Sequence, residues 1–167
     1  MPIDRFFTSG QSIDLLYRDA ERGSVLDRKA GKENGLVNWL SELAFWEYFN
    51  TSTFSKPHRD KFVAGKIYED FMNRVLPGVS YFYAVETHPG GHGEHIHGLL
   101  SGCYAGLFKE RKPGKQWAAQ HGLCKTERIR SAEGVHNYVL KYVVGDPDAL
   151  FGQNIKEGAH KGEVRAI

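Results

Sequence analysis

The chain has 167 residues, which predicts a single domain large enough to bury a hydrophobic core. Aromatic residues make up 13% of it, which argues against global disorder, and the net charge of +2 neither requires nor excludes a polyanionic partner. Cys103 and Cys124 are too few for a disulfide framework and favour a reducing compartment. No apolar run has membrane-spanning length and the N-terminus lacks the apolar segment of a signal peptide, so we expect a soluble, cytoplasmic protein without a membrane partner.

The N-terminal quarter of the chain is polar, and we expect residues 1–40 to form a partly helical extension. Within it, residues 12–29 favour a charged surface helix and residues 28–35 a loop. The core is expected over residues 41–146. The glycine-rich, charged tail over residues 147–167 carries no predicted element, and it either belongs to the same domain or is a linker.

The first elements of the expected core are a strand and a helix. The stretch from Glu47 to Phe54 ends in alternating side chains, which favours a strand. From Asp60 to Leu76 the apolar residues recur near helical spacing until Pro77-Gly78, which predicts a helix that ends there.

A β-hairpin is predicted next. The composition of Val79 to His88 is typical of a strand, and Pro89-Gly90-Gly91 turns the chain back into a second strand around His95.

A basic loop over residues 109–115 follows, then a short helix over 115–121 and a strand over 124–129. Ser131 is a candidate N-cap for a last helix over residues 132–144. This order of elements predicts an α+β domain with helices packed against an antiparallel sheet.

Two histidines, His95 and His97, lie two residues apart in the predicted hairpin and therefore project from the same face of their strand. Neighbouring imidazoles at the edge of a core cost desolvation, and a divalent metal is the usual reason to keep such a pair. A two-residue turn or a four-residue loop places Glu86 directly opposite His95, whereas a three-residue turn does not. Glu86, His95 and His97 would then form a site suited to Mg²⁺ or Mn²⁺ acting on a phosphate.

Other readings of these residues stay open. His88 shares a face with Glu86 and is an alternative ligand, while His92 in the turn is expected at the surface. Core packing alone also produces histidine pairs of this spacing.

The last predicted helix carries two tyrosines and a lysine. Three valines at four-residue spacing form an apolar stripe; Tyr142 falls close to it, Tyr138 lies at its margin, and Lys141 is one turn from Tyr138. A phenol with a neighbouring ammonium is a suitable nucleophile for a phosphodiester when a metal polarises the phosphate. The same Tyr-x-x-Lys spacing also arises by chance on amphipathic helices.

Together, and in this order, the two features resemble the HUH endonuclease superfamily. More narrowly, they resemble the rolling-circle replication initiators (Rep proteins) of small plasmids, bacteriophages and single-stranded DNA viruses. His95-Ile96-His97 matches the second family motif and Tyr138-Val139-Leu140-Lys141 the third, while Phe49 to Phe54 is similar to the first. The resemblance covers about residues 45–145. It implies a central five-stranded antiparallel sheet of RRM-like topology with flanking helices, and Glu86 as the third metal ligand.

The resemblance also implies a reaction. Single-stranded DNA would cross the sheet, and the metal would polarise the scissile phosphate. Tyr138 would attack it with the help of Lys141, leaving a 5′-phosphotyrosine link and a free 3′-hydroxyl that can later rejoin. Some phage initiators alternate two tyrosines four residues apart, which is the spacing of Tyr138 and Tyr142. Because Lys141 lies three residues after Tyr138, we favour Tyr138 as the sole or principal nucleophile.

Basic residues are candidates for contacts with the DNA backbone, although each also suits a solvated surface. The group over residues 109–115 is the best of them. Trp46 and Trp117 could stack bases, but core packing is the more usual role of each. The basic candidates are Arg59, Lys61, Lys109, Arg111, Lys112, Lys115, Lys125, Arg128 and Arg130.

The resemblance implies an origin, in the form of a stem-loop, as the DNA partner. It also implies a bacterial or archaeal host and a plasmid or virus that encodes the protein. No helicase region follows the tyrosine helix, so we expect either a separate helicase or a longer parent protein. The alternatives are a tyrosine transposase of the same superfamily, a conjugative relaxase, whose nucleophile normally precedes the histidines, and a non-catalytic module that binds single-stranded DNA.

Overall fold

A computed structural model gives the fold of the chain. It describes residues 6–8, 35–56, 60–88, 90–131, 133–138, 141, 142, 146 and 148–157. The helix expected over residues 12–29 lies outside the described residues, as do Arg59 and the chain beyond residue 157.

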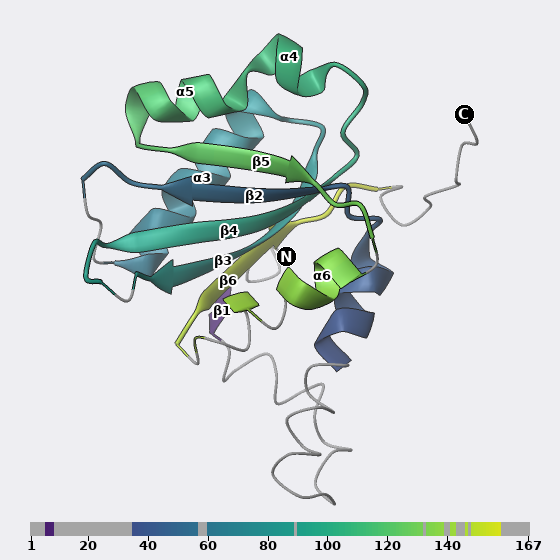
Figure 1. Cartoon of the computed structure of the whole chain (residues 1–167), viewed down its shortest axis with the longest axis horizontal. Helices are drawn as coiled ribbons and strands as arrows, with labels where there is room; N and C mark the ends of the chain where they lie inside the picture. The colour runs from purple at the N-terminus through teal and green to yellow at the C-terminus, as the bar shows by residue number, and fades with distance from the viewer. Residues whose placement is uncertain are drawn as a thin grey trace, which may run out of the picture.

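An antiparallel sheet forms the centre of the molecule, with the strand order β1-β6-β3-β4-β2-β5 (Figure 1). β3 and β4 are the hairpin predicted from the sequence, and β2 and β5 are the other two predicted strands. The strands are β1 (Phe6–Thr8), β2 (Tyr48–Thr53), β3 (Ser80–Thr87), β4 (Glu94–Ser101), β5 (Cys124–Arg128) and β6 (Leu150–Asn154).

The topology confirms the predicted α+β class with an antiparallel sheet. The strands β2, β3, β4 and β5 and the helices between them follow one another as β-α-β-β-α-β, and they lie in the spatial order β3-β4-β2-β5. This is the RRM-like arrangement. β6 is the fifth strand, and the three-residue β1 pairs with its free side.

β6 lies in the tail where the sequence predicts no element. Its apolar residues, Leu150 and Phe151, are buried, and the strand pairs with β3 from Val85 to Tyr81. Five residues with one glycine give little periodic signal. Pairing with a long, buried strand therefore decides this conformation, rather than local preference.

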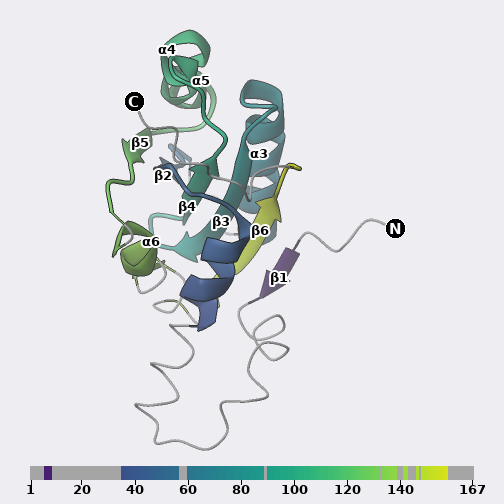
Figure 2. The same ribbon diagram turned by 90° about the vertical axis from the view of Figure 1, so that its right-hand side faces the viewer.

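Helices cover both faces of the sheet (Figures 1 and 2). α3 lies on one face, and α6 and a helix over residues 35–43 lie on the other. α4 and α5 are close to the edge strand β5. The labelled helices are α3 (Lys61–Val75), α4 (Leu107–Arg111), α5 (Pro113–Gln120) and α6 (Glu133–Tyr138). None of the helices in the described part of the chain has the length and apolar character needed to cross a membrane.

α3 begins where the sequence predicts. The carboxylate of Asp60 caps it by accepting hydrogen bonds from the backbone N–H groups of Phe62 and Val63, at 2.8 and 3.2 Å. Its buried side chains include Tyr68, Phe71 and Met72, which face the sheet.

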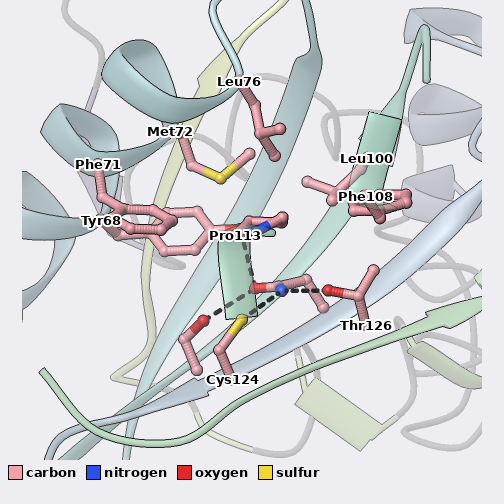
Figure 3. A pocket seen from close by; sticks show the side chains of 11 residues that line it. Tyr68, Phe71, Met72, Leu76, Leu100, Phe108, Pro113, Cys124 and Thr126 are labelled. Carbon is pink, nitrogen blue, oxygen red and sulfur yellow. Dashed lines mark hydrogen bonds between the residues drawn. The ribbon is translucent and has the colours of Figure 1, made fainter. Parts of the chain in front are cut away.

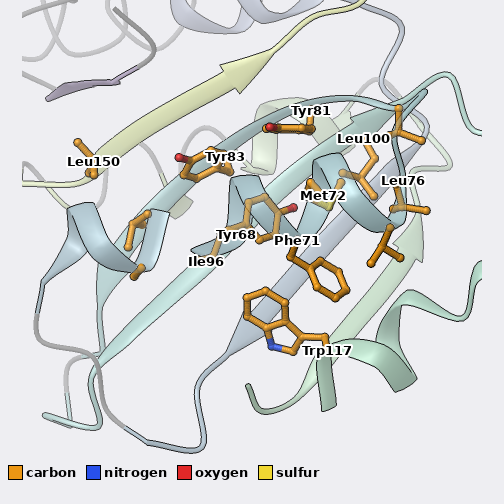
Figure 4. Close-up of a cluster of buried hydrophobic side chains, with 14 of the residues drawn as sticks. Tyr68, Phe71, Met72, Leu76, Tyr81, Tyr83, Ile96, Leu100, Trp117 and Leu150 are labelled. Carbon is orange, nitrogen blue, oxygen red and sulfur yellow. The ribbon is translucent and has the colours of Figure 1, made fainter. Parts of the chain in front are cut away.

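Two hydrophobic cores result, one on each face. The first lies between the sheet and the helices α3 and α5, and it contains Tyr68, Phe71, Tyr83 and Trp117 (Figure 4). The second joins the sheet to α6 and the helix over residues 35–43, and it contains Leu40, Trp46, Phe82, Leu99 and Tyr138. Trp46 and Trp117 are therefore core residues, and each indole N–H donates to a backbone carbonyl, of Leu40 and Thr53 respectively.

Gly98 lets α3 approach the centre of the sheet. The Tyr68 hydroxyl donates a hydrogen bond of 3.2 Å to Asn50 Oδ1 on β2, and a Cβ added at Gly98 would come within 2.5 Å of that hydroxyl oxygen. The buried Tyr68–Asn50 contact therefore requires glycine at this position of β4.

We expect Gly98→Ala to lower the free energy of unfolding by about 1–3 kcal/mol, because the new methyl group overpacks the core. Tyr68→Phe alone should cost about 1 kcal/mol through the lost hydrogen bond. The double variant should be more stable than the sum of the two losses predicts, because removing the hydroxyl makes room for the methyl group. Urea unfolding of the four proteins measures this, and strict additivity would contradict the expected clash.

Candidate active site

The hairpin register brings Glu86 and both histidines to one face of the sheet. Glu86 pairs directly with His95, as a two-residue turn or a four-residue loop predicts, and Ala84 pairs with His97. The His88 N–H donates to the Gly93 carbonyl at 2.9 Å, so His88 and Gly93, which are five positions apart in the chain, face each other across the hairpin. Alternate residues of a strand share a face, and Glu86, His95 and His97 therefore project toward the side on which α6 lies.

His97 is the most enclosed of these side chains, with a relative exposure of 6%. Its Nδ1 lies 3.4 Å from the Thr51 hydroxyl of β2, and its Nε2 lies 3.7 Å from Glu86 Oε2 of β3. The central position of β4, between β2 and β3, provides both neighbours.

Burial sets the protonation of this pair. Desolvation lowers the pKa of His97 to about 3, and it raises the pKa of Glu86 to about 7, with the negative charge of Asp146 as the next cause. His97 is therefore neutral at pH 7, and its contact with Glu86 is not an ion pair. A neutral imidazole is also the form that binds a metal.

His95 lies farther from His97 and closer to His88. Its ring centre lies 6.3 Å from that of His97 and only 4.5 Å from that of His88. Desolvation lowers its pKa, and the neighbouring histidines lower it further. Over the residues that the structure describes, no three His, Cys, Asp or Glu side chains are already grouped closely enough to hold a metal.

The donor chemistry nevertheless fits a divalent metal. Two imidazoles that are neutral at pH 7 and a carboxylate face the same side of a rigid sheet, and a cation would favour ionised Glu86. His95 would have to turn from His88 toward His97 to complete the set. Glu86, His95 and His97 are therefore the residues that could hold the ion, and the His88 ring lies beside that of His95.

Tyr138 of α6 packs against this face of the sheet and is buried. Its hydroxyl donates a hydrogen bond of 2.6 Å to the backbone carbonyl of His97, and its relative exposure is 2%. Burial raises its pKa well above 10, and the charge of Glu86 raises it further. The small Ala84, opposite His97, leaves space for the ring.

Tyr142 is the tyrosine whose ring lies against His97. The two ring centres are 3.7 Å apart at an interplanar angle of 21°, and Tyr142 also stacks on Phe49 at 5.4 Å. The Lys141 ammonium lies 5.0 Å from the centre of the Tyr142 ring, and a hydrogen bond with Tyr142 raises the pKa of Lys141. Tyr142 is only partly buried, so its side chain is reachable from solvent.

The structure adds an ion pair that the sequence pattern does not predict. Lys61, in the first turn of α3, donates to Asp146 Oδ2 at 3.0 Å and to the backbone carbonyl of Asp148 at 2.8 Å. It thereby ties α3 to the chain that follows the tyrosines. Nothing in the spacing of two residues 85 positions apart signals this contact.

Most of the basic candidates lie away from Glu86 and His97, but Lys61 is close enough for its charge to lower the pKa of Glu86. Lys109 and Arg111 belong to α4, Lys112 joins α4 to α5, and Lys115 is in α5, all close to the edge strand. On β5, the pairing of Thr51 with Lys125 brings Lys125 to the face that carries His97. Arg128 pairs with Tyr48 and shares the opposite face. Arg130 follows β5 and is exposed.

No protein-family model matches this sequence, and comparisons with curated proteins and with solved structures likewise gave no match.

We expect Mn²⁺ to bind at this face, with Glu86→Gln and His97→Gln each weakening the affinity by about tenfold or more, because loss of even an outer-shell partner costs about 10–100-fold. His121→Gln is the matched control, since His121 packs against Trp117 on the other face. Isothermal titration of the four proteins measures the effect. Equal Mn²⁺ affinities in all four would exclude Glu86 and His97 as ligands.

Proposed function

We propose that this protein is a metal-dependent endonuclease that cuts single-stranded DNA with a tyrosine nucleophile, in the manner of HUH replication initiators. The observation that carries the proposal is the stack of Tyr142 on His97, in a place where His97 also faces Glu86. Candidate metal ligands and a candidate nucleophile thus meet on one face of the sheet, although Tyr142 lies 45 positions after His97 in the chain.

The contacts support different roles for the two tyrosines. The Tyr138 hydroxyl is buried and already donates to the His97 carbonyl, so an attack by Tyr138 would first have to break that bond. Tyr142 is reachable and has an ammonium beside it, which would stabilise the negative charge of an attacking phenolate. We therefore assign the attack to Tyr142 and a positioning role to Tyr138, which reverses the preference drawn from the sequence.

The reaction follows from these roles. The Tyr142 oxygen attacks the phosphorus in line, an O–P bond to tyrosine forms, and the bond from phosphorus to the 3′-oxygen breaks. The phenolic proton goes to solvent, and the departing 3′-oxygen gains a proton to become the free hydroxyl. A divalent metal, when bound, would polarise the phosphate oxygens as a Lewis acid. The 3′-hydroxyl can reverse the step and rejoin the strand.

The wider proposal is that the DNA is an origin, in the form of a stem-loop, and that a separate helicase supplies unwinding. The protein would then act in the cytoplasm of a bacterial or archaeal host during rolling-circle replication of a plasmid or virus.

A labelled single-stranded oligonucleotide with the origin sequence, incubated with Mn²⁺, should form a covalent adduct that survives denaturation. Tyr142→Phe should abolish the adduct. Tyr138→Phe should keep a slower reaction and lower the unfolding free energy by about 1 kcal/mol, because the variant loses a buried hydrogen bond to the His97 carbonyl. Tyr104→Phe, on an exposed tyrosine near α4, is the matched control.

Loss of the adduct in Tyr138→Phe alone, with Tyr142→Phe fully active, would return the nucleophile to Tyr138. Metal-independent binding of the oligonucleotide with no cleavage in any variant would instead favour a non-catalytic DNA-binding module. Cleavage that requires transposon ends rather than an origin hairpin would favour a tyrosine transposase.

The ion pair of Lys61 with Asp146 gives a separate prediction. Lys61→Glu and Asp146→Lys should each slow adduct formation at saturating DNA by about tenfold or more, because a small misplacement of reacting groups can cost about 100-fold. The double charge reversal should recover much of the rate, because it restores an ion pair between the two positions. Equal rates in the single variants and the wild type would show that the pair does not position the tyrosines.

A further inference from the structure

A second site lies on the opposite face of the sheet, at the edge formed by β5. A groove of about 330 Å³, which we call the α5 groove, runs between β2, β5 and the junction of α4 with α5. Its volume falls in the range of about 300–1,000 Å³ that is typical of small-molecule sites. Tyr48, Phe108, Lys112, Lys115, Cys124 and Thr126 line it.

The charge of the α5 groove has one sign. Lys112 and Lys115 are the charged side chains among the described residues that line it, and both are exposed. The nearest acidic residues in the sequence have partners elsewhere: Glu110 accepts from the Tyr104 hydroxyl at 2.6 Å, and Glu127 pairs with Lys125 at 2.9 Å. An anion is therefore the ligand that this wall attracts.

The backbone at the α4–α5 junction adds to this charge. Lys112 has φ 48° and ψ 49°, which is a left-handed conformation. Among the described residues, no other non-glycine residue has a positive φ. Pro113 follows as the first residue of α5, and no side chain caps this end of the helix. The positive end of the α5 dipole is thus beside the two lysines.

The remaining wall is aromatic and apolar. Tyr48 and Phe108 meet edge to face with ring centres 4.6 Å apart, and both are partly buried. Flat apolar surfaces of this kind accept nucleic-acid bases, and they do so for every base because each has a π-face. The basic side of the groove suits an anion, and the aromatic side suits a planar ring. A nucleotide carries both groups.

The floor offers a polar contact as well. Asn50 Nδ2 donates to Thr126 Oγ1 at 3.0 Å and to Cys124 Sγ at 3.3 Å, around a buried cavity of about 10 Å³ that shares Phe108, Pro113, Cys124 and Thr126 with the groove (Figure 3). Because the Thr126 oxygen already accepts from Asn50, its hydroxyl proton is left to donate. A base carbonyl in the groove is a suitable acceptor.

We propose that the α5 groove binds one nucleotide of the DNA strand, with its phosphate at Lys112 and Lys115 and its base against Phe108 and Tyr48. This assignment rests on the proposed function, because the nucleotide belongs to the DNA strand that the nuclease binds. That strand leaves the His97 face and passes over the edge of β5. β5 is the second strand from β4, and neighbouring strands are about 4.8 Å apart, so the path is short.

The probes are thymidine 5′-monophosphate, thymidine, inorganic phosphate and an oligothymidine without an origin sequence, added to the full chain. Amide NMR signals of Gly114, Lys115 and Thr126 should shift with the monophosphate more than with phosphate or thymidine, and with the oligothymidine at lower concentration. A response to the monophosphate without a response to the oligothymidine would make free nucleotides, rather than a strand, the ligand and would overturn the proposed source.

Two variants test the walls. Lys112→Gln/Lys115→Gln should reduce the slope of log K against log salt for the oligothymidine by about 0.7, because both lysines contact the same phosphate and each neutralised phosphate of a single strand contributes about 0.7. Lys66→Gln, on the exposed side of α3, is the control and should leave the slope unchanged. Phe108→Leu should reduce the preference for monophosphate over phosphate by about fivefold or more.

The outcome separates this inference from the proposed function. An unchanged salt slope in the double lysine variant and no shifts at Gly114 and Thr126 would overturn the groove assignment, even if the Tyr142 adduct forms. Shifts at these amides without any adduct would support the groove and reject the nuclease.

Discussion

The hydrogen bond from the Tyr138 hydroxyl to the His97 carbonyl is the contact on which the candidate active site depends. It joins the last labelled helix to the centre of the sheet at the residue that also faces Glu86 and Thr51. Because the bond is buried, breaking it would cost more than breaking an exposed one. Tyr142, four residues further on, therefore lies over the His97 ring rather than over solvent.

Because His97 and Glu86 are buried, they form no ion pair with each other at neutral pH, and a bound metal would interact favourably with both. The neutral imidazole of His97 and the carboxyl of Glu86, with its pKa raised to about 7, lie 3.7 Å apart without forming an ion pair at neutral pH. A cation between them would favour the ionised carboxylate and use the imidazole lone pair. The same enclosure raises the pKa of Tyr138, which suits a hydrogen-bond donor better than a nucleophile.

The two proposed sites lie on opposite faces of the sheet. The face with α6 carries the candidate ligands and both tyrosines, whereas the basic residues of the α4–α5 junction are grouped around the α5 groove on the other face. Alternation along β2 produces this division, because Tyr48 and Asn50 face one side while Phe49 and Thr51 face the other.

The sequence by itself determined the elements whose signals are local. The alternation in the hairpin, with a two-residue turn or a four-residue loop, places Glu86 opposite His95, and the apolar spacing predicts α3 from Asp60 to the stop at Pro77-Gly78. Only the tertiary structure decided the contacts between distant segments: the strand β6, the pairing of Lys61 with Asp146, and the different environments of Tyr138 and Tyr142. Helical spacing places both tyrosines near one apolar stripe, but it does not say which hydroxyl meets a backbone carbonyl. The partner of each hydroxyl depends on the position of α6 over β4. Packing between segments that are distant in the sequence determines this position, and no local pattern encodes it.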